Sequence, residues 1–403
     1  KHTHSKKGDL PKNNNYKIQN KDQEKEKGGT KPKMHSFVVA GTTFTVESKY
    51  KLIKQIGQGA YGVVCSCKDT TKDSNNEFYK VAIKKVPNAF EDLIDAKRIL
   101  REIKLLKFFN HENIVSLCDI PRPPGRTGYE DIYFITDLMG TDLHRVIYSK
   151  QELTDEYIQF FIYQIVRGVL YMHSANVVHR DLKPSNILSN ADCHIKICDL
   201  GLGRGGMPES NDENDKKNAE LNNEENVPLT TYVITRWYRA PEVILSPSEY
   251  SKAVDIWSMG CILGELLGRT PLFPGDHYLD QVQKIASILG SPSTSDLEFV
   301  TKKEAREFVM KLPKKKGKPF SSLFPDANPV ALDLMSKMLV FNPNKRATIE
   351  ECIAHPYFKG LHDPGEEPLA QKHFDWSFDD IKLTKENLQS MVYDESSHFH
   401  PEN

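Results

Sequence analysis

Two short motifs near the middle of the chain contain the residue types that phosphoryl transfer requires. The first is His-Arg-Asp-Leu-Lys-Pro-Ser-Asn at 179–186, and the second is Asp-Leu-Gly at 199–201. Transfer of a terminal phosphoryl group needs an in-line hydroxyl, neutralisation of charge and a metal that clamps the phosphates. Asp181 can accept the proton of the hydroxyl, and Lys183 can neutralise the group in transit. The first motif therefore predicts a catalytic loop.

The same two motifs supply ligands for a metal. Asn186 and Asp199 offer oxygen atoms, which the hard cation Mg²⁺ prefers. A surface loop followed by an ordinary polar turn is the simpler interpretation. Because the combined pattern is long and correctly spaced, it favours a Mg²⁺ site beside the catalytic loop.

The composition is that of an ordinary globular chain. Its 403 residues are 38% hydrophobic and 27% charged, and the formal net charge of −1 gives no general field that favours nucleic acid or membrane. No apolar run approaches the ~18–20 residues of a membrane span. The seven cysteines are scattered and odd in number, so we expect reduced thiols and a location in the cytoplasm and nucleus. Residues 1–36, rich in lysine and asparagine, are predicted to form a disordered basic tail.

Ordered structure is expected from about Phe37, beginning with a short hairpin. A strand predicted over 50–56 leads into Gly-Gln-Gly-Ala-Tyr-Gly, and strand residues follow again. A lone G-x-G-x-x-G is weak evidence, but a dinucleotide-binding turn would lead into a helix. The pattern is typical of the glycine-rich hairpin of kinases, in which glycines let backbone amides approach the nucleotide phosphates. The predicted contacts are Gly57, Gln58, Gly59, Ala60, Tyr61 and Gly62, with Val64 on the adenine.

A lysine and a glutamate are the next nucleotide-binding candidates. Lys84 ends the predicted strand Val-Ala-Ile-Lys at 81–84, and Glu102 lies on a helix predicted over 93–108. An exposed lysine and a solvated glutamate are the simpler alternatives. Their context favours an ion pair in which Lys84 holds the α- and β-phosphates of a nucleotide.

A buried strand predicted over 132–135 leads to residues 136–140, which we interpret as a linker between two lobes. Such a linker would offer backbone N–H and C=O groups to the edge of adenine, with Thr136 at the back of the pocket. The ATP-binding candidates of this region are Thr136, Asp137 and Met139, and Ala82 of the strand predicted at 81–84 is a further one. Beyond the linker, apolar spacing over 153–174 predicts a helix, and most of the chain after 242 is expected to be helical.

Residues 201–232 are predicted to form a loop, whose middle (205–226) is polar and has no apolar period. Together, these motifs resemble the eukaryotic protein kinases, and four features resemble the mitogen-activated protein kinase family. The resemblance runs from about Phe37 to about Glu395. Its four features are a dual-phosphorylation lip at Thr230 and Tyr232, a helical insert at about 286–325, an acidic docking patch after His355-Pro356, and a C-terminal extension that begins at 369.

The resemblance implies further roles. Phosphate pairs best with planar guanidinium groups, and five arginines match those that receive phosphate in the family. Those expected to gather around phosphorylated Thr230 are Arg101, Arg180 and Arg204, and those expected to receive phosphate on Tyr232 are Arg236 and Arg239; none has another evident partner in the sequence. The docking residues that the resemblance implies are Asp363, Glu366 and Glu367.

The chain departs from the family pattern at three positions and in the length of the lip. Leu200 replaces the usual Phe, and because leucine is also apolar we expect metal binding to survive. Gly203 replaces a usual Ala, and Thr231 between the phosphosites matches none of the familiar branches. The lip is longer than usual, chiefly over 205–226.

Two other classes of protein are alternatives to this interpretation. A cyclin-dependent kinase would lack the lip tyrosine and the C-terminal extension, and its helix motif differs from the one at 95–102. A non-catalytic scaffold with a kinase fold usually loses a catalytic or metal-binding residue, whereas Lys84, Asp181, Asn186 and Asp199 are all present. An ATP-dependent phosphorylation assay separates these classes.

The predicted fold is therefore α+β and two-lobed. A β-rich small lobe is expected over 37–137, a mainly helical large lobe over 138–368 and the C-terminal extension over 369–403. The resemblance implies ATP and Mg²⁺ as cofactors, substrates with Ser/Thr-Pro sites, an upstream dual-specificity kinase, basic docking peptides and phosphatases. A monomer without nucleic acid or membrane partners is expected. The basic run at 311–318 is expected to form a solvated loop, with a nuclear signal as the alternative.

Overall fold

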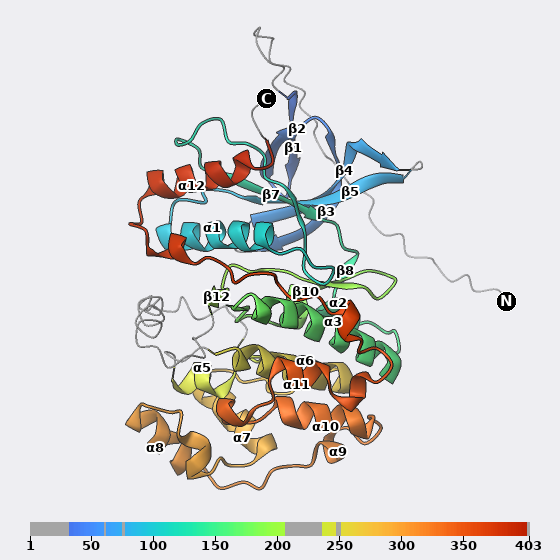
Figure 1. Ribbon diagram of the computed structural model, residues 1–403, viewed down its shortest axis with the longest axis vertical. Coiled ribbons are helices and arrows are strands. Elements are labelled where there is room, and N and C mark those ends of the chain that lie inside the picture. Colours follow the sequence, from blue (N-terminus) through green and yellow to red (C-terminus); the bar gives the residue numbers. More distant parts are fainter. Residues whose placement is uncertain (1–31, 60–61, 75–76, 206–235, 247–250, 401–403) are drawn as a thin grey trace, which may run out of the picture. The chain divides into compact units, whose positions relative to one another are not determined.

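The computed structural model describes residues 32–59, 62–74, 77–205, 236–246 and 251–400 (Figure 1). The chain divides into two compact units. The first comprises the residues up to Ala89, Cys118–Leu138 and the residues from Ser396; the second comprises Phe90–Leu117 and Met139–Glu395. Among the described helices, none is both long and apolar enough to cross a membrane.

The first unit is built from β-strands. The predicted hairpin is confirmed as β1 (Met34–Val39) and β2 (Thr42–Glu47), so ordered structure begins slightly before Phe37. The tail predicted at 1–36 lies mostly outside the described residues. A five-stranded sheet has the order β3-β4-β5-β7-β6. Its strands are β3 (Tyr50–Gly59), β4 (Gly62–Ser74), β5 (Glu77–Val86), β6 (Leu117–Asp119) and β7 (Ile132–Asp137).

The two faces of this sheet differ because successive strand residues point to opposite sides. On one face, Cys65 and Ile83 are fully buried and pack in a cluster with Phe37 and Phe44 of the β1–β2 hairpin. On the other face Ser66 is buried, but three neighbouring residues remain partly exposed. These residues are Val64, Ala82 and Lys84. The predicted nucleotide-binding residues of β4 and β5 therefore share the face that the hairpin leaves uncovered.

The second unit is mainly helical (Figure 1). Its helices are α1 (Leu93–Phe108), α2 (Leu143–Ile147), α3 (Asp155–Ser174), α5 (Pro241–Leu245), α6 (Ala253–Gly268), α7 (Tyr278–Leu289), α8 (Lys303–Lys311), α9 (Phe320–Leu323), α10 (Pro329–Met338) and α11 (Ile349–Ile353), and the last described helix is α12 (Lys385–Ser397). Short strands β8 (Thr141–Asp142), β9 (Val177–Val178), β10 (Ile187–Ser189), β11 (Ile195–Ile197) and β12 (Arg204–Gly205) lie between α1 and α5 in the sequence.

The core of the second unit forms between α3, α6, α10 and α11. The helix α6 is apolar on nearly all sides, as expected for a helix enclosed by others, and its Trp257 is fully buried and stacks on Phe273. Local signals set several helix ends. Asp92 caps the N-terminus of α1, and Thr348 with Glu351 forms a capping box on α11. The predicted helices at 93–108 and 153–174 are confirmed as α1 and α3.

Two predicted boundaries differ from the structure. Helix α1 was expected in the small lobe but groups with the helical unit, where Arg101 contacts Gly201 and Asp379, and Lys104 pairs with Glu395. The predicted linker at 136–140 is shorter than expected, because its first two residues pair with β5 and belong to β7. Long-range contacts decide both boundaries, and the local sequence does not display them.

Candidate active site

The predicted catalytic loop lies between β9 and β10, and a buried carboxylate of α6 holds its backbone. Asp255 Oδ2 accepts hydrogen bonds from His179 N at 2.8 Å and from His173 Nε2 at 2.9 Å, and its Oδ1 accepts one from Arg180 N at 2.9 Å. Burial opposes ionisation of Asp255, but the bond from His173 and the neighbouring donors outweigh it, so the pKa of Asp255 lies below its usual value. Arg180 has a left-handed backbone (φ 71°), which these bonds help to fix.

Asp181 stands at the centre of a hydrogen-bonded group. Its Oδ2 accepts from Lys183 Nζ at 2.6 Å and from Asn186 Nδ2 at 3.1 Å, and the Asn186 amide also donates to the Asp181 carbonyl at 2.9 Å. Both donors converge on one carboxylate oxygen. Among the described residues no side chain donates to Oδ1, which is left to accept a bond from an incoming hydroxyl. The structure thus brings together the two residues predicted for catalysis, Asp181 and Lys183, and the predicted metal ligand Asn186.

A second connection ties this loop to the Asp-Leu-Gly motif. His179 accepts a bond from Asp181 N through Nδ1 at 3.2 Å and donates through Nε2 to the carbonyl of Cys198 at 3.0 Å. Asn186 also accepts a bond from Cys198 N at 2.9 Å. Cys198, the residue before Asp199, is thus hydrogen-bonded through both its carbonyl and its N–H to residues of the catalytic loop.

The two predicted metal ligands fit a hard cation. Asn186 uses its amide nitrogen for Asp181, which leaves its oxygen as an acceptor. Asp199 is exposed and has a left-handed backbone (φ 64°), while its neighbour Leu200 is fully buried. Leucine thus fills the apolar position where the family usually has Phe. The oxygen pair formed by Asn186 and Asp199 is the donor set expected for Mg²⁺.

Gly203, the second departure from the family pattern, lies in a tight place. A Cβ at this position would lie 2.9 Å from the Leu105 side chain and 3.1 Å from the carbonyl of Leu200. Glycine therefore suits the close approach of this segment to α1. Thr231, the third departure, lies outside the described residues.

The glycine-rich hairpin belongs to the first unit. Gly57 and Gly59 of β3 pair with Val64 and Gly62 of β4. Gly62 has a φ of +138°, and a Cβ there would lie only 2.0 Å from the carbonyl of Lys85. Ala60 and Tyr61, both predicted to contact the nucleotide, fall outside the described residues. The strand pairing supports a hairpin at this position, as predicted.

Two consecutive lysines of β5 point to different environments. Lys85 is buried, and its ammonium pairs with Asp131 at 2.6 Å and donates to the carbonyl of Thr43 at 2.7 Å. Lys84 is on the opposite face, with its ammonium 5.1 Å from the centroid of the Phe134 ring. Lys84 is therefore the lysine of this pair that lies on the face predicted to bind the nucleotide.

The remaining nucleotide-binding candidates lie in both units. Thr136 pairs with Ala82 and Asp137 with Val81 across β7 and β5. Glu102 is buried on α1 of the second unit, and Met139 also belongs to that unit. The ion pair between Glu102 and Lys84 of the first unit stays a prediction.

The five predicted phosphate-receiving arginines have partners that the sequence did not reveal. Arg236 Nη1 donates to the carbonyl of Asp276 at 2.6 Å, and Arg239 Nη1 donates to the hydroxyl of Tyr278 at 2.7 Å. Both guanidinium groups also lie about 6 Å from the centroid of the Tyr278 ring, at 5.7 and 5.8 Å. Arg101 pairs with Asp379.

The premise that these arginines lack other partners is therefore wrong. Arg204 donates to the carbonyl of Gly203 at 3.0 Å, and Arg180 also has a contact. The predicted phosphosites Thr230 and Tyr232, and the lip segment from 206, lie outside the described residues.

The acidic docking residues differ from one another. Asp363 and Glu366 are exposed, whereas Glu367 is buried. Glu367 Oε1 accepts a bond from the Tyr163 hydroxyl at 2.8 Å and lies 2.8 Å from His362 Nδ1. Burial and the nearby Glu367 raise the pKa of Tyr163 to about 12. In this structure the Glu367 carboxylate therefore holds the turn, which differs from its predicted place on a docking surface.

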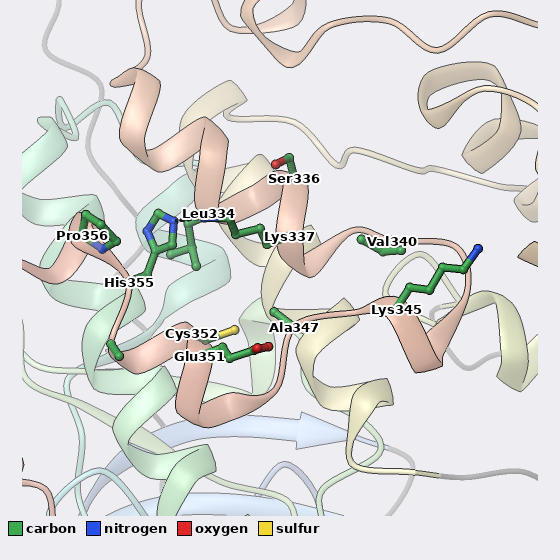
Figure 2. Close-up of a pocket in the computed structure, with 11 residues that line it drawn as sticks. Leu334, Ser336, Lys337, Val340, Lys345, Ala347, Glu351, Cys352, His355 and Pro356 are labelled. Carbon is green, nitrogen blue, oxygen red and sulfur yellow. Dashed lines mark hydrogen bonds between the residues drawn. The ribbon is translucent and has the colours of Figure 1, made fainter.

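A separate cavity of about 520 Å³ lies in the second unit near α10 and α11 (Figure 2). Lys337 and His355 are among its lining residues, and both contact the carboxylate of Asp333. Lys345, also in the lining, pairs with Asp296 at 2.8 Å. None of the predicted catalytic or nucleotide-binding residues lines this cavity, so it is distinct from the site described above.

Two residues with roles in this site were missed by the sequence analysis. Asp255 is one of two carboxylates in an otherwise apolar helix, which is a signal that it has a specific buried partner. Asp379 carries no such signal, because acidic residues are common in the C-terminal segment.

Comparison with known proteins agrees with this geometry. Residues 50–358 match the model of the protein kinase domain. The chain is 48% identical over 367 residues to "Extracellular signal-regulated kinase 1" of Dictyostelium discoideum, covering 91% of this chain and 66% of that protein. It is 46% identical to "Mitogen-activated protein kinase 3" of Arabidopsis thaliana and 48% identical to "Mitogen-activated protein kinase homolog NTF6" of Nicotiana tabacum, in each case over 91% of this chain and 93% of the relative.

Proposed function

Because this chain belongs to the mitogen-activated protein kinase family, and is a serine/threonine protein kinase of intracellular signalling, we propose that it transfers the γ-phosphoryl group of ATP to serine or threonine followed by proline. The observation that carries the proposal is the group around Asp181. Lys183 and Asn186 both donate to one of its carboxylate oxygens.

The chain's own residues then have distinct tasks. The free oxygen of Asp181 accepts the bond from the substrate hydroxyl, orients it for in-line attack and takes its proton. The Lys183 ammonium lies beside that carboxylate and neutralises negative charge on the transferring group. Asp255 keeps the loop backbone in place for both side chains.

Protein kinases use ATP, typically with Mg²⁺. We assign Asn186 and Asp199 as the residues that hold the metal and Lys84, with the glycine-rich hairpin, as the part that binds the phosphates. Bound Mg²⁺ supplies neutralisation of phosphate charge. The free oxygen of Asn186 and the exposed carboxylate of Asp199 support this assignment.

The preference for proline follows from the segment after the lip. In most kinases, an atom of the enzyme accepts a hydrogen bond from the amide N–H of the residue that follows the phosphorylated serine. Proline has no N–H to donate. In the family that acceptor is turned toward an arginine, and Arg236 and Arg239 are the residues that support the same arrangement here.

Activity is further proposed to require phosphate on both Thr230 and Tyr232, added by an upstream dual-specificity kinase and removed by phosphatases. Each phosphate adds roughly −1.5 to −2 charges. The enzyme is proposed to act as a monomer in the cytoplasm and nucleus, and to bind basic docking peptides through Asp363 and Glu366.

The first experiment compares phosphorylation of a Ser-Pro peptide by the wild type, Asp181→Asn and the matched control Asp192→Asn. Asp192 is an exposed carboxylate in the turn between β10 and β11. We expect Asp181→Asn to lose on the order of 10²-fold or more of the turnover, as for a missing positioning base. Retention of more than about a tenth of the turnover would refute the role of Asp181. Equal rates on Ser-Pro and Ser-Ala peptides would refute the proline preference.

The second experiment compares the unphosphorylated, singly phosphorylated and doubly phosphorylated forms on that peptide. A coupling of ~1–3 kcal/mol predicts an increase of about 5–150-fold in activity. An unphosphorylated enzyme within about threefold of the doubly phosphorylated one would contradict the proposed switch.

A further inference from the structure

The basic strip, residues 311–318 of the helical insert, is a feature that the kinase reaction does not use. It connects α8 to α9 and contains no acidic residue. Its five lysines are Lys311, Lys314, Lys315, Lys316 and Lys318, and all of them are exposed.

The backbone of the strip is fixed against the end of α7. Ser291 N donates to the carbonyl of Lys315 at 3.0 Å, and Lys315 N donates to Ser291 Oγ at 2.9 Å. Lys318 N donates to the carbonyl of Ile288 at 2.8 Å. Leu312, within the strip, and Phe320, just after it, pack against the core of the unit. The strip is therefore held at both ends and in its middle, while its lysines are exposed, as in the solvated loop that the sequence predicted.

A close approach of two backbones explains the glycine in the strip. A Cβ on Gly317 would lie 2.5 Å from the carbonyl of Leu289, and one on Gly290, which has a φ of +93°, would lie 2.7 Å from Gly317 N. No side chain fits between the strip and the end of α7 without movement of the backbone. The backbone of the strip is therefore fixed by this packing, while the neighbouring lysine side chains are exposed to solvent.

The charge of the strip is largely uncompensated. Lys311 pairs with Glu307 of α8 at 3.4 Å. For the other four lysines, no carboxylate in the described ranges lies within ion-pair distance. The chain as a whole has a net charge of −1, so this concentration of positive charge is local and attracts an anionic partner over about a Debye length, ~8–10 Å.

The main chain of the strip also offers hydrogen-bonding groups. The peptide groups of Lys314 and Lys316 make no hydrogen bond with any residue that the structure describes, and both residues are exposed. An extended peptide can use such groups by pairing along an edge, while its side chains meet those of the edge. We propose that the basic strip is a docking surface for an extended acidic peptide of a partner protein.

Other polyanions fit the strip less well. The strip has neither arginine nor an aromatic residue, which are the side chains that read or stack on nucleic acid bases. A membrane surface would also meet Glu304 and Glu307, which are exposed on the adjoining α8, and anionic lipids repel these carboxylates.

The test is the binding of a fluorescently labelled dodecapeptide of alternating Glu and Thr to the whole chain, measured by anisotropy. Lys314→Gln/Lys316→Gln should weaken binding about tenfold, since two exposed charge pairs of ~0.2–1 kcal/mol each are lost. The matched control Lys302→Gln/Lys303→Gln removes two exposed lysines outside the strip and should change binding less than about twofold. Raising the salt from about 50 to 300 mM should weaken wild-type binding. Hydrogen exchange should slow at the amides of residues 314 and 316 when the peptide is bound.

Several outcomes would overturn the proposal. One is the absence of peptide binding to the wild type, and another is equal weakening by the two double variants. Binding of a DNA duplex or of phosphatidylserine vesicles as tight as that of the acidic peptide would assign the strip to another partner. Phosphorylation of a short Ser-Pro peptide should be unchanged in Lys314→Gln/Lys316→Gln. A loss of that activity would place the strip in the active site and contradict a separate docking role.

Discussion

Arg101 of α1 and Asp379 of the C-terminal extension form a buried ion pair. Arg101 Nη2 lies 3.0 and 2.9 Å from the two carboxylate oxygens, and the guanidinium is fully buried. The same guanidinium donates through Nη1 to the carbonyl of Gly201 at 3.3 Å. A carboxylate of the extension thus pairs with the arginine that is proposed to receive the phosphate of Thr230. This arginine also contacts the Asp-Leu-Gly segment.

Replacement of Asp379 by Asn should make stability depend on phosphorylation. The variant leaves the buried Arg101 without its carboxylate, which costs about 3–5 kcal/mol for a broken buried pair. Phosphate on Thr230 can then pair with Arg101, so phosphorylation should raise the melting temperature of Asp379→Asn more than that of the wild type. The matched control is Asp380→Asn, which removes the adjacent, exposed carboxylate. Equal thermal shifts in both variants would show that Asp379 and phosphate do not share this arginine.

Two glycines of the glycine-rich hairpin, Gly59 and Gly62, should respond differently to alanine. Gly62→Ala places a Cβ 2.0 Å from the carbonyl of Lys85 at a φ of +138°. We expect a loss on the order of 2 kcal/mol or more in the free energy of unfolding and weaker ATP binding. Gly59→Ala meets no atom within 4 Å and serves as the control. The check is denaturant unfolding of both variants, and equal stabilities would contradict the hairpin geometry.

The acidic turn should separate into docking and structural residues. Asp363→Lys with Glu366→Lys should weaken phosphorylation of protein substrates severalfold and leave a short peptide unaffected, because both carboxylates are exposed. Glu367→Gln should instead lower the free energy of unfolding by about 1–3 kcal/mol, since the Tyr163 hydroxyl and His362 lose a charged partner. Equal effects of the double variant on both substrates would argue against docking at this turn.

The stability of the protein should fall in mild acid because of His111. Burial, with a contribution from Arg167, lowers the pKa of His111 from 6.5 to about 4. Between these values the unfolded chain binds a proton that the folded chain does not, so His111 should lower the free energy of unfolding by up to about 1.4 kcal/mol per pH unit as the pH falls from 6.5 toward 4.

His111→Gln removes this titration and should flatten the pH dependence in that range. The measurement is denaturant unfolding at several pH values. An unchanged slope in the variant would mean that other groups cause the loss of stability.

The sequence by itself determined the local elements and the identity of the chemistry. The strand and helix periods placed β1, β2, α1 and α3 correctly, because periodicity depends on residues close in the chain. The motif at 179–186 contained all three side chains of the Asp181 group within one short loop, so their proximity needed no tertiary information.

Tertiary structure alone decided which distant residues hold these elements in place. Asp255 bonds to the backbone of Arg180, 75 positions away, and Asp379 pairs with Arg101, 278 positions away. The burial of Lys85 against Asp131 and Thr43, and the burial of Glu367 beside two exposed carboxylates, also became visible only in the fold. The physical reason is that a side chain's burial and charge partners depend on packing between segments far apart in the chain, which no local pattern of residues specifies.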